Sequence, residues 1–115
     1  IPNLVTIRPA DASETAEAWK VALARADGPT ALVLTRQKLG FIDRAAHAPA
    51  AGLARGAYVL KEADGGAPHV VLLSSGSEVA LALDAAGRLA AEGIGARVVS
   101  VPSMELFATQ DAAYR

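Results

Sequence analysis

The sequence contains no cysteine, few aromatic residues (4%) and no long hydrophobic run. The absence of cysteine excludes disulfide-bonded scaffolds and thiolate metal sites, and it suits a reducing cytosol. No stretch approaches the roughly 18 consecutive apolar residues of a membrane-spanning helix. Neither sign of charge dominates, because 11 lysines and arginines stand against 12 acidic residues and the net charge is −1. We therefore expect a cytoplasmic globular protein that binds neither nucleic acid nor membranes.

The length and composition of the chain allow a modest hydrophobic core, since it has 115 residues and 52% of them are hydrophobic. Both ends have features of the interior of a longer protein. Ile1 is not an initiator methionine and stands just before an apolar run, and residues 111–115 are interpreted as the beginning of a helix. Since domains usually end in exposed polar linkers, we expect this chain to be an internal fragment.

The first third of the chain predicts a strand, a helix and a second strand. Residues 5–9 are a short apolar run closed by proline, and Asp11 and Glu14 are spaced like a capping box at the start of a helix. Residues 30–34 are a continuous apolar run, which indicates a strand buried on both faces. The helix between them is predicted to turn one apolar face inward, with Trp19 as a core residue. That face comprises Ala12, Ala16, Trp19, Leu23 and Ala26.

The middle of the chain shows no clear periodicity. From residue 38 to about residue 55, glycine, alanine and proline alternate with scattered charges. A stretch of that length without regular elements is usually a linker or a functional loop. We therefore predict two domain parts, residues 1–39 and 56–115, joined by a linker over residues 40–55.

The second half predicts further strands and one long helix. Strands are expected at residues 57–60, 70–73 and 97–101, the second of them buried, and a helix at residues 77–92. The strand–helix–strand order implies a parallel crossover, so the whole pattern predicts an α/β fold with parallel or mixed sheets. The helix is expected to turn inward Val79, Leu83, Ala86 and either Leu89 or Ala90.

Arg36 is the most informative residue by its position. It follows the predicted strand at residues 30–34, and ligands of open α/β sheets bind beyond the carboxyl ends of the strands. A guanidinium group presents a planar fork of donors that suits phosphate or carboxylate. Arg36 is therefore a candidate anion-binding residue, with a surface arginine in a loop as the alternative.

Other polar residues give weaker signals. Residues 74–78 (SSGSE) form a small-residue turn whose amides would suit an anion, but the spacing matches no nucleotide-binding motif and Glu78 would repel the anion. We favour helix capping there. His47 and His69 have no partners at metal-ligand spacing, so we expect neither a metal nor a base role for them. No catalytic or metal-binding residue is predicted.

Several segments together resemble the transketolase family. Residues 1–4 (IPNL) and 8–14 (RPADASE) are similar to a segment near the end of that family's pyrimidine-binding domain, and residues 28–37 (GPTALVLTRQ) are similar to its last strand. The second half resembles the start of the family's C-terminal domain. The matching segments there are residues 56–60 (GAYVL), 75–79 (SGSEV), 97–103 (RVVSVPS), 105–107 (ELF), 110–111 (QD) and 114–115 (YR).

The resemblance implies parts of two thiamine-enzyme domains joined by a linker. It implies a parent enzyme of the pentose phosphate pathway that transfers a two-carbon ketol unit from a ketose phosphate to an aldose phosphate, of the xylulose 5-phosphate and ribose 5-phosphate class. The family uses thiamine diphosphate and a divalent metal (Mg or Ca) and forms homodimers. Arg36 matches the family's arginine that holds the substrate phosphate. No cofactor, metal or catalytic residue is carried over, so this segment alone is expected to be inactive.

Three alternatives remain open at this point. The parent is either a single chain or a split transketolase of which this is the C-terminal subunit. A related thiamine synthase of deoxyxylulose phosphate is disfavoured by residues 8–11 (RPAD) and 35–37 (TRQ). A non-catalytic α/β interaction or regulatory module is compatible with the crossover unit, although nothing in the sequence requires it.

Overall fold

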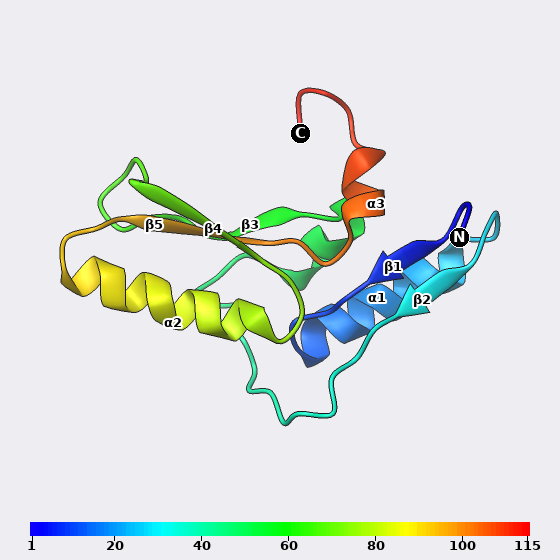
Figure 1. Cartoon of the computed structure of the whole chain (residues 1–115), viewed down its shortest axis with the longest axis horizontal. Helices are drawn as coiled ribbons and strands as arrows, with labels where there is room; N and C mark the ends of the chain where they lie inside the picture. Colours follow the sequence, from blue (N-terminus) through cyan, green and yellow to red (C-terminus); the bar gives the residue numbers. More distant parts are fainter.

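The computed structural model describes all 115 residues, and it contains two small sheets that meet near the middle of an elongated molecule (Figure 1). In the first sheet, β1 (Val5–Ile7) pairs in parallel with β2 (Thr30–Leu32), and α1 (Ala12–Ala24) connects the two strands. Pro9 ends β1, and the side chain of Asp11 caps α1, as the sequence predicts. No helix is both long and apolar enough to cross a membrane.

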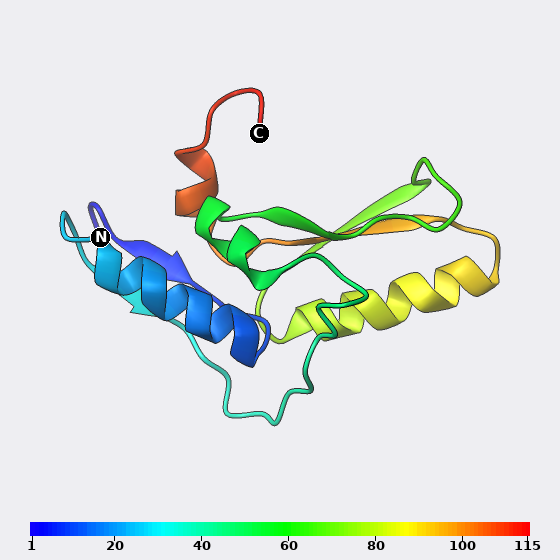
Figure 2. The same cartoon turned by 180° about the vertical axis from the view of Figure 1, so that it is seen from behind.

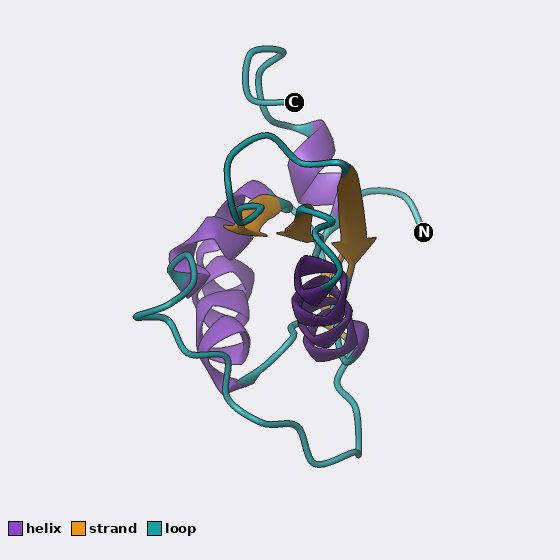
Figure 3. Ribbon diagram, turned by 90° about the vertical axis from the view of Figure 1, so that its left-hand side faces the viewer, coloured by secondary structure: helices purple, strands orange, loops and turns teal.

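The second sheet has three strands in the order β3-β5-β4. β4 (Val70–Ser74) and β5 (Ala96–Ser100) are parallel and are connected by α2 (Glu78–Ala91), while β3 (Tyr58–Lys61) pairs antiparallel with β5. The predicted strands and the predicted helix are therefore present, and the α/β class with parallel and mixed sheets is confirmed. In the end-on view of Figure 3, the two long helices lie beneath the strands of the second sheet.

The segment between the two sheets is packed against both of them. It contains a 3-10 helix, η1 (Ala50–Arg55), which the sequence does not predict, and η1 lies between α1 and α3 (Met104–Ala108) in Figure 2. Leu53 of η1 is fully buried, and burial of a leucine side chain contributes about 1.5–3 kcal/mol. Ile42 is buried as well. The predicted linker at residues 40–55 thus carries core residues.

The apolar core crosses from one sheet to the other. One cluster joins β1, α1 and η1, and a second joins the end of β1 to β3 and α2 through the connecting segment. Each cluster draws on residues more than 30 positions apart in the sequence, and the second cluster combines residues from both halves of the chain. The buried members are Val5, Ile7, Ala18 and Leu53 in the first cluster, and Ala10, Ile42, Tyr58, Leu60 and Val79 in the second.

The predicted inward face of α1 is wrong. Trp19 is 53% exposed and Leu23 is 79% exposed, while Glu14 and Ala18 are fully buried. Two sets of residues in α1 have helical spacing, and the predicted inward face is the more apolar of the two. The structure buries the other stripe because the small side chain of Ala18 admits η1 and because Glu14 has buried polar partners, described below.

Two strands predicted to be buried on both faces are half-exposed. Leu34 beyond β2 is 56% exposed, and Leu73 in β4 is 70% exposed. Within these 115 residues a helix covers only one face of each sheet, so the side chains on the other face have no neighbour to pack against. The face of α2 is as predicted, since Val79 and Ala86 are buried on its inner side.

Residues 111–115 form a single turn in which the amide of Arg115 donates to the carbonyl of Asp111 at 3.1 Å, as in the first turn of a helix. The amide of Tyr114 donates to Oδ1 of Asp111 at 2.8 Å, which closes a turn. The Tyr114 hydroxyl donates to the carbonyl of Ala57 at 2.6 Å and fixes this turn against the second sheet. The helix before this turn is α3, whose own first turn is capped by the hydroxyl of Ser103.

Candidate functional site at the facing strand ends

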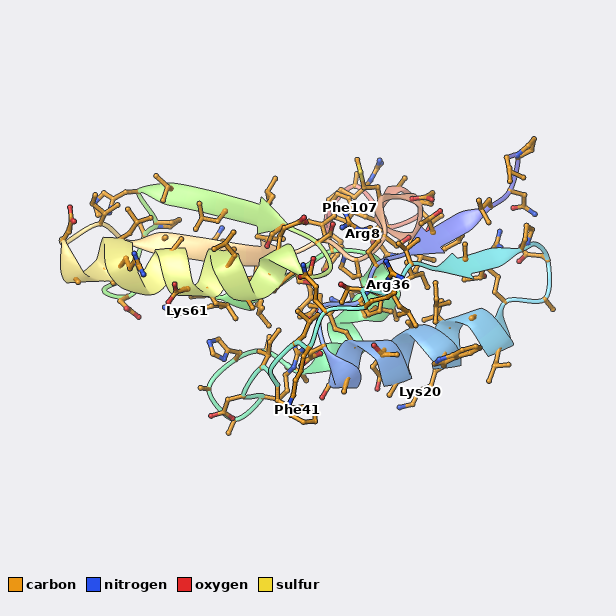
Figure 4. The ribbon with its side chains drawn as sticks, turned by 60° about the horizontal axis from the view of Figure 1, so that its bottom comes forward. Arg8, Lys20, Arg36, Phe41, Lys61 and Phe107 are labelled. Carbon is orange, nitrogen blue, oxygen red and sulfur yellow. The ribbon has the colours of Figure 1, made fainter.

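The carboxyl ends of β1 and β2 face those of β4 and β5. We call the segments that follow these strands the strand-end junction; it comprises residues 8–10, 33–36, 74–77 and 101–102. Figure 4 shows Arg8 and Arg36 in this central region. Because ligands of open α/β sheets bind beyond the carboxyl ends of the strands, both halves of the chain indicate the same place for a ligand.

Arg36 lies in this junction, where the sequence predicts it. It stands in a bend four residues beyond β2, its side chain is exposed, and it makes no hydrogen bond or ion pair with any other residue. A guanidinium group without protein partners keeps its fork of donors available to a ligand. The structure therefore leaves Arg36 able to bind an anion.

Arg8 is a second cation at the junction, and the sequence analysis does not single it out. Its Nη1 donates to Oγ of Ser75 at 3.0 Å, and its Nη2 lies 3.6 Å from a carboxylate oxygen of Glu78. Its backbone is also bound on both sides, because the Arg8 amide donates to Pro102 at 2.8 Å and the Arg8 carbonyl accepts from Gly76 at 3.1 Å. Arg8 thus ties the first sheet to the strand ends of the second.

Two clefts open on either side of Arg8. The smaller, of about 210 Å³, is lined by Pro9, residues 33–35 and residues 76–77 in addition to Arg8. The larger, of about 430 Å³, is bounded by the ends of β4 and β5 and by α3. The hydroxyl of Ser74 borders this larger cleft and has no hydrogen-bond partner.

The turn at residues 74–78 does not cap α2 with a side chain. Ser77 stands at the N-cap position but its hydroxyl makes no capping bond, and the first amides of the helix bind the backbone carbonyls of Ser75 and Gly76 instead. The capping role predicted for these side chains is wrong. The hydroxyl of Ser75 accepts from Arg8, so this turn serves the contact between the sheets.

A buried polar cluster lies next to the strand-end junction and connects the two sheets. We call it the polar core; its members come from α1, the connecting segment, β3 and β5, and they are Asp11, Glu14, Arg44, Tyr58 and Ser100. The acidic pair was expected only to cap the helix, and it does, with the Glu14 amide donating to Asp11 at 2.9 Å and the Ala10 amide donating to Glu14 at 3.1 Å. Its further partners lie 31 to 86 positions away along the chain.

Glu14 is the centre of this polar core. Its Oε2 accepts from the hydroxyl of Tyr58 at 2.6 Å and from the hydroxyl of Ser100 at 2.9 Å. Arg44 donates to Tyr58 at 2.9 Å and to Asp11 at 3.0 Å, and it lies 3.7 Å from Glu14. A buried carboxylate is tolerated only when its oxygens are satisfied in this way. These contacts hold the two sheets in one arrangement.

The environment of Tyr58 raises the pKa of its hydroxyl well above the ordinary value near 10. Burial is the main cause, and the negative charge of Glu14 and the hydrogen bond to it add to the effect. Ionising Tyr58 would place a phenolate beside a carboxylate in a buried site. Tyr58 is therefore a neutral hydrogen-bond donor at neutral pH.

This shift predicts a loss of stability in alkaline solution. Above about pH 10 the unfolded chain releases the Tyr58 proton while the folded chain keeps it. The contribution of Tyr58 to the free energy of unfolding is therefore fully present below pH 10, and it is lost as pH rises, by up to about 1.4 kcal/mol per pH unit. Urea unfolding between pH 8 and pH 11 would measure this slope. Tyr58→Phe is the control, since it cannot ionise, and equal slopes in both proteins would contradict the prediction.

The two histidines have structural contacts. Nδ1 of His47 lies 2.8 Å from the carbonyl of Asp43, and Nδ1 of His69 accepts from the amide of Gly95 at 2.9 Å. Neither ring reaches the strand-end junction. His47 thus supports a turn of the connecting segment, and His69 supports the loop before β5.

The residues of this chain do not fit a metal or a diphosphate–metal site. Divalent metals of this kind take several oxygen ligands, and the chain brings no three histidine, aspartate or glutamate side chains together in a metal-binding group. The buried carboxylates of Asp11 and Glu14 are occupied by the hydrogen bonds of the polar core.

Comparison with known proteins gives matches over both halves. The family model of the transketolase pyrimidine-binding domain matches residues 1–41, and the model of the transketolase-like C-terminal domain matches residues 56–115. The transketolase of Geobacillus stearothermophilus is 51% identical over 115 residues, which are the whole of this chain and 17% of the relative. This chain thus spans about a sixth of the length of its curated relatives.

Solved structures agree with these matches. A transketolase of Pichia stipitis in complex with sedoheptulose 7-phosphate superimposes with a TM-score of 0.87 at 35% identity, over 98% of this chain and 16% of that one. A variant of the same enzyme in complex with xylulose 5-phosphate gives the same values. The chain therefore belongs to the transketolase family, and its two sheets are parts of the family's pyrimidine-binding and C-terminal domains.

Proposed function

We propose that this chain is part of a transketolase that transfers a two-carbon ketol unit from a ketose phosphate to an aldose phosphate. Identity near 50% along the whole chain supports this function over a non-catalytic interaction or regulatory module. The proposed substrates are of the xylulose 5-phosphate and ribose 5-phosphate class, in keeping with the sugar phosphates named for the similar structures. The enzyme is proposed to be a cytoplasmic homodimer that uses thiamine diphosphate and Mg or Ca.

Within this enzyme, Arg36 is proposed to bind the phosphate group of the sugar. The observation that carries the proposal is an exposed guanidinium group, without protein partners, at the junction that four strand ends share. Bidentate hydrogen bonds from an arginine suit a phosphate, and a contact far from the reacting carbonyl contributes binding and orientation. The carbon–carbon bond chemistry belongs to the cofactor.

The division of the chain into domains is part of the same proposal. Residues 1–39 are assigned to the pyrimidine-binding domain and residues 56–115 to the C-terminal domain, with residues 40–55 as the connection. This connection is rigidly held, because Arg44 is bound in the polar core and Leu53 is packed in the apolar core. We expect the two domains to move as one unit.

The proposal predicts a phosphate-specific defect in the Arg36→Ala variant of the full-length enzyme. We expect KM for xylulose 5-phosphate to rise about tenfold or more, since one charge-assisted contact contributes about 1.5–3 kcal/mol. KM for hydroxypyruvate, a ketol donor without phosphate, is expected to change less than about twofold. Steady-state kinetics with both donors measure the ratio.

Two controls sharpen this test. Arg88→Ala removes an arginine that pairs with Asp84 on the surface of α2, and it should change neither KM. The 115-residue chain alone, with added thiamine diphosphate and magnesium, should show no transfer. Equal losses with both donors in Arg36→Ala would refute the phosphate role, and turnover by the chain alone would refute its dependence on the rest of the enzyme.

A further inference from the structure

We propose that Arg8 is a positioning residue that holds the segment bearing Arg36 in place by binding the C-terminal domain. The inference rests on the proposed function of Arg36 and extends it to the contact between the two domains. Arg8 follows β1 directly, and it is the residue through which the first sheet binds the strand ends of the second. It makes four polar contacts there, two from its backbone and two from its side chain.

Arg8 is anchored to the second sheet by both its backbone and its side chain. Its amide and carbonyl bind Pro102 and Gly76, which follow β5 and β4. The side chain spans the same turn, with Nη1 donating to Ser75 at 3.0 Å. The ion pair with Glu78 at 3.6 Å is half-exposed on both sides, so it adds little to the hydrogen bond. The guanidinium group therefore fixes β1 relative to the β4–α2 turn chiefly through the Ser75 hydroxyl.

The pairing of β1 with β2 connects Arg8 to the segment that bears Arg36. The amide of Val33 donates to the carbonyl of Ile7 at 2.8 Å, which extends the pairing of the two strands to the residue beside Arg8. Beyond that bond, residues 33–35 form one wall of the 210 Å³ cleft of which Arg8 and Pro9 form another. Arg36 has no bond of its own to the rest of the chain. Its location is therefore set by the segment that leads to it.

Direct binding of the phosphate by Arg8 is the alternative to positioning, and the contacts distinguish the two. Two of the Arg8 nitrogens are directed at Ser75 and Glu78, whereas those of Arg36 are free. A positioning residue acts only through Arg36, so its effect should vanish once Arg36 is gone. A second phosphate ligand would instead weaken binding further in the absence of Arg36.

The test uses the full-length enzyme with Arg8→Leu, Ser75→Ala, Arg36→Ala and the double variant Arg8→Leu/Arg36→Ala. We expect Arg8→Leu to raise KM for xylulose 5-phosphate about five- to tenfold with kcat and KM for hydroxypyruvate nearly unchanged, because displacement of a binding group by about 1 Å weakens its contact. Ser75→Ala keeps the charge of Arg8 and breaks its bond, so it should raise the same KM about two- to threefold. The double variant should match Arg36→Ala.

The outcomes separate this inference from the proposed function. A phosphate-specific defect in Arg36→Ala, with no change of KM in Arg8→Leu and Ser75→Ala, would overturn the positioning role alone. A further loss in the double variant would overturn it in favour of direct binding by Arg8. A silent Arg36→Ala would overturn the proposed phosphate role together with this inference. Arg88→Leu, which removes a surface arginine of α2, is the matched control and should behave as the unchanged enzyme.

Discussion

Replacing Glu14 with alanine is expected to lower the free energy of unfolding by about 3–5 kcal/mol, the range for breaking a buried charged cluster. Glu14 is fully buried and accepts hydrogen bonds from Tyr58, Ser100 and the amide of Ala10. Its removal leaves these three donors without an acceptor and leaves a cavity beneath the junction of the sheets. Arg44 also loses a negative charge 3.7 Å away.

Urea unfolding of the 115-residue chain, followed by circular dichroism, measures this loss. Glu14→Gln keeps the shape and one acceptor, so we expect a smaller loss of about 1–2 kcal/mol. Glu17→Ala is the matched control on the same helix, because Glu17 pairs only with an exposed lysine, and it should cost less than about 0.5 kcal/mol. A loss in Glu14→Ala as small as that in Glu17→Ala would show that the polar core does not hold the sheets together.

Replacing Gly56 with alanine is expected to lower the free energy of unfolding by about 4 kcal/mol or more. Gly56 ends η1 in the left-handed conformation, with φ of 83°, which costs an alanine about 1–2 kcal/mol. A Cβ at this position would also overlap the amide nitrogen of Phe107 and the carbonyl oxygen of Ser103, and it would lie 2.8 Å from the carbonyl carbon of Leu106. These are backbone atoms of α3 and its cap, which cannot rotate away.

The same unfolding measurement tests this second prediction. Gly87→Ala is the control, because a Cβ at Gly87 meets nothing within 4 Å in the middle of α2. There alanine should stabilise the helix by about 0.5–1 kcal/mol, the difference in helix propensity. If Gly56→Ala were as stable as the unchanged chain, the close approach of η1 to α3 would not exist in solution.

Arg36 is the one residue of the candidate site that could be predicted from the sequence. Arg36 follows an apolar run at a distance that places it beyond the carboxyl end of a strand, and the structure places it there. Arg8 has the same relation to β1. However, Pro9 and the capping pair beyond it already account for the end of the strand and the start of the helix, so the local sequence gives no reason to single out Arg8. Only the contact with the β4–α2 turn gives Arg8 a further role, and that contact joins residues 67 positions apart.

The polar core was not predictable, for a similar reason. Asp11 and Glu14 satisfy a local rule at the start of a helix, so nothing in their spacing points to a second set of partners. Tyr58 and Ser100 come from antiparallel strands of the other sheet, and Arg44 comes from a segment without periodicity. Their contacts exist only after the two sheets have packed.

Local sequence patterns specify the alternation of strands and helices, because period-two and period-3.6 patterns, turns and caps act over a few residues. Motifs in both halves also specify the α/β class and the family. Which stripe of α1 is buried depends on the packing of the whole chain. Trp19 and Leu23 form the more apolar stripe, yet Glu14 and Ala18 face inward because their partners in η1, β3 and β5 lie far along the chain. Hydrophobicity alone does not encode that choice, because it depends on which surfaces fit together.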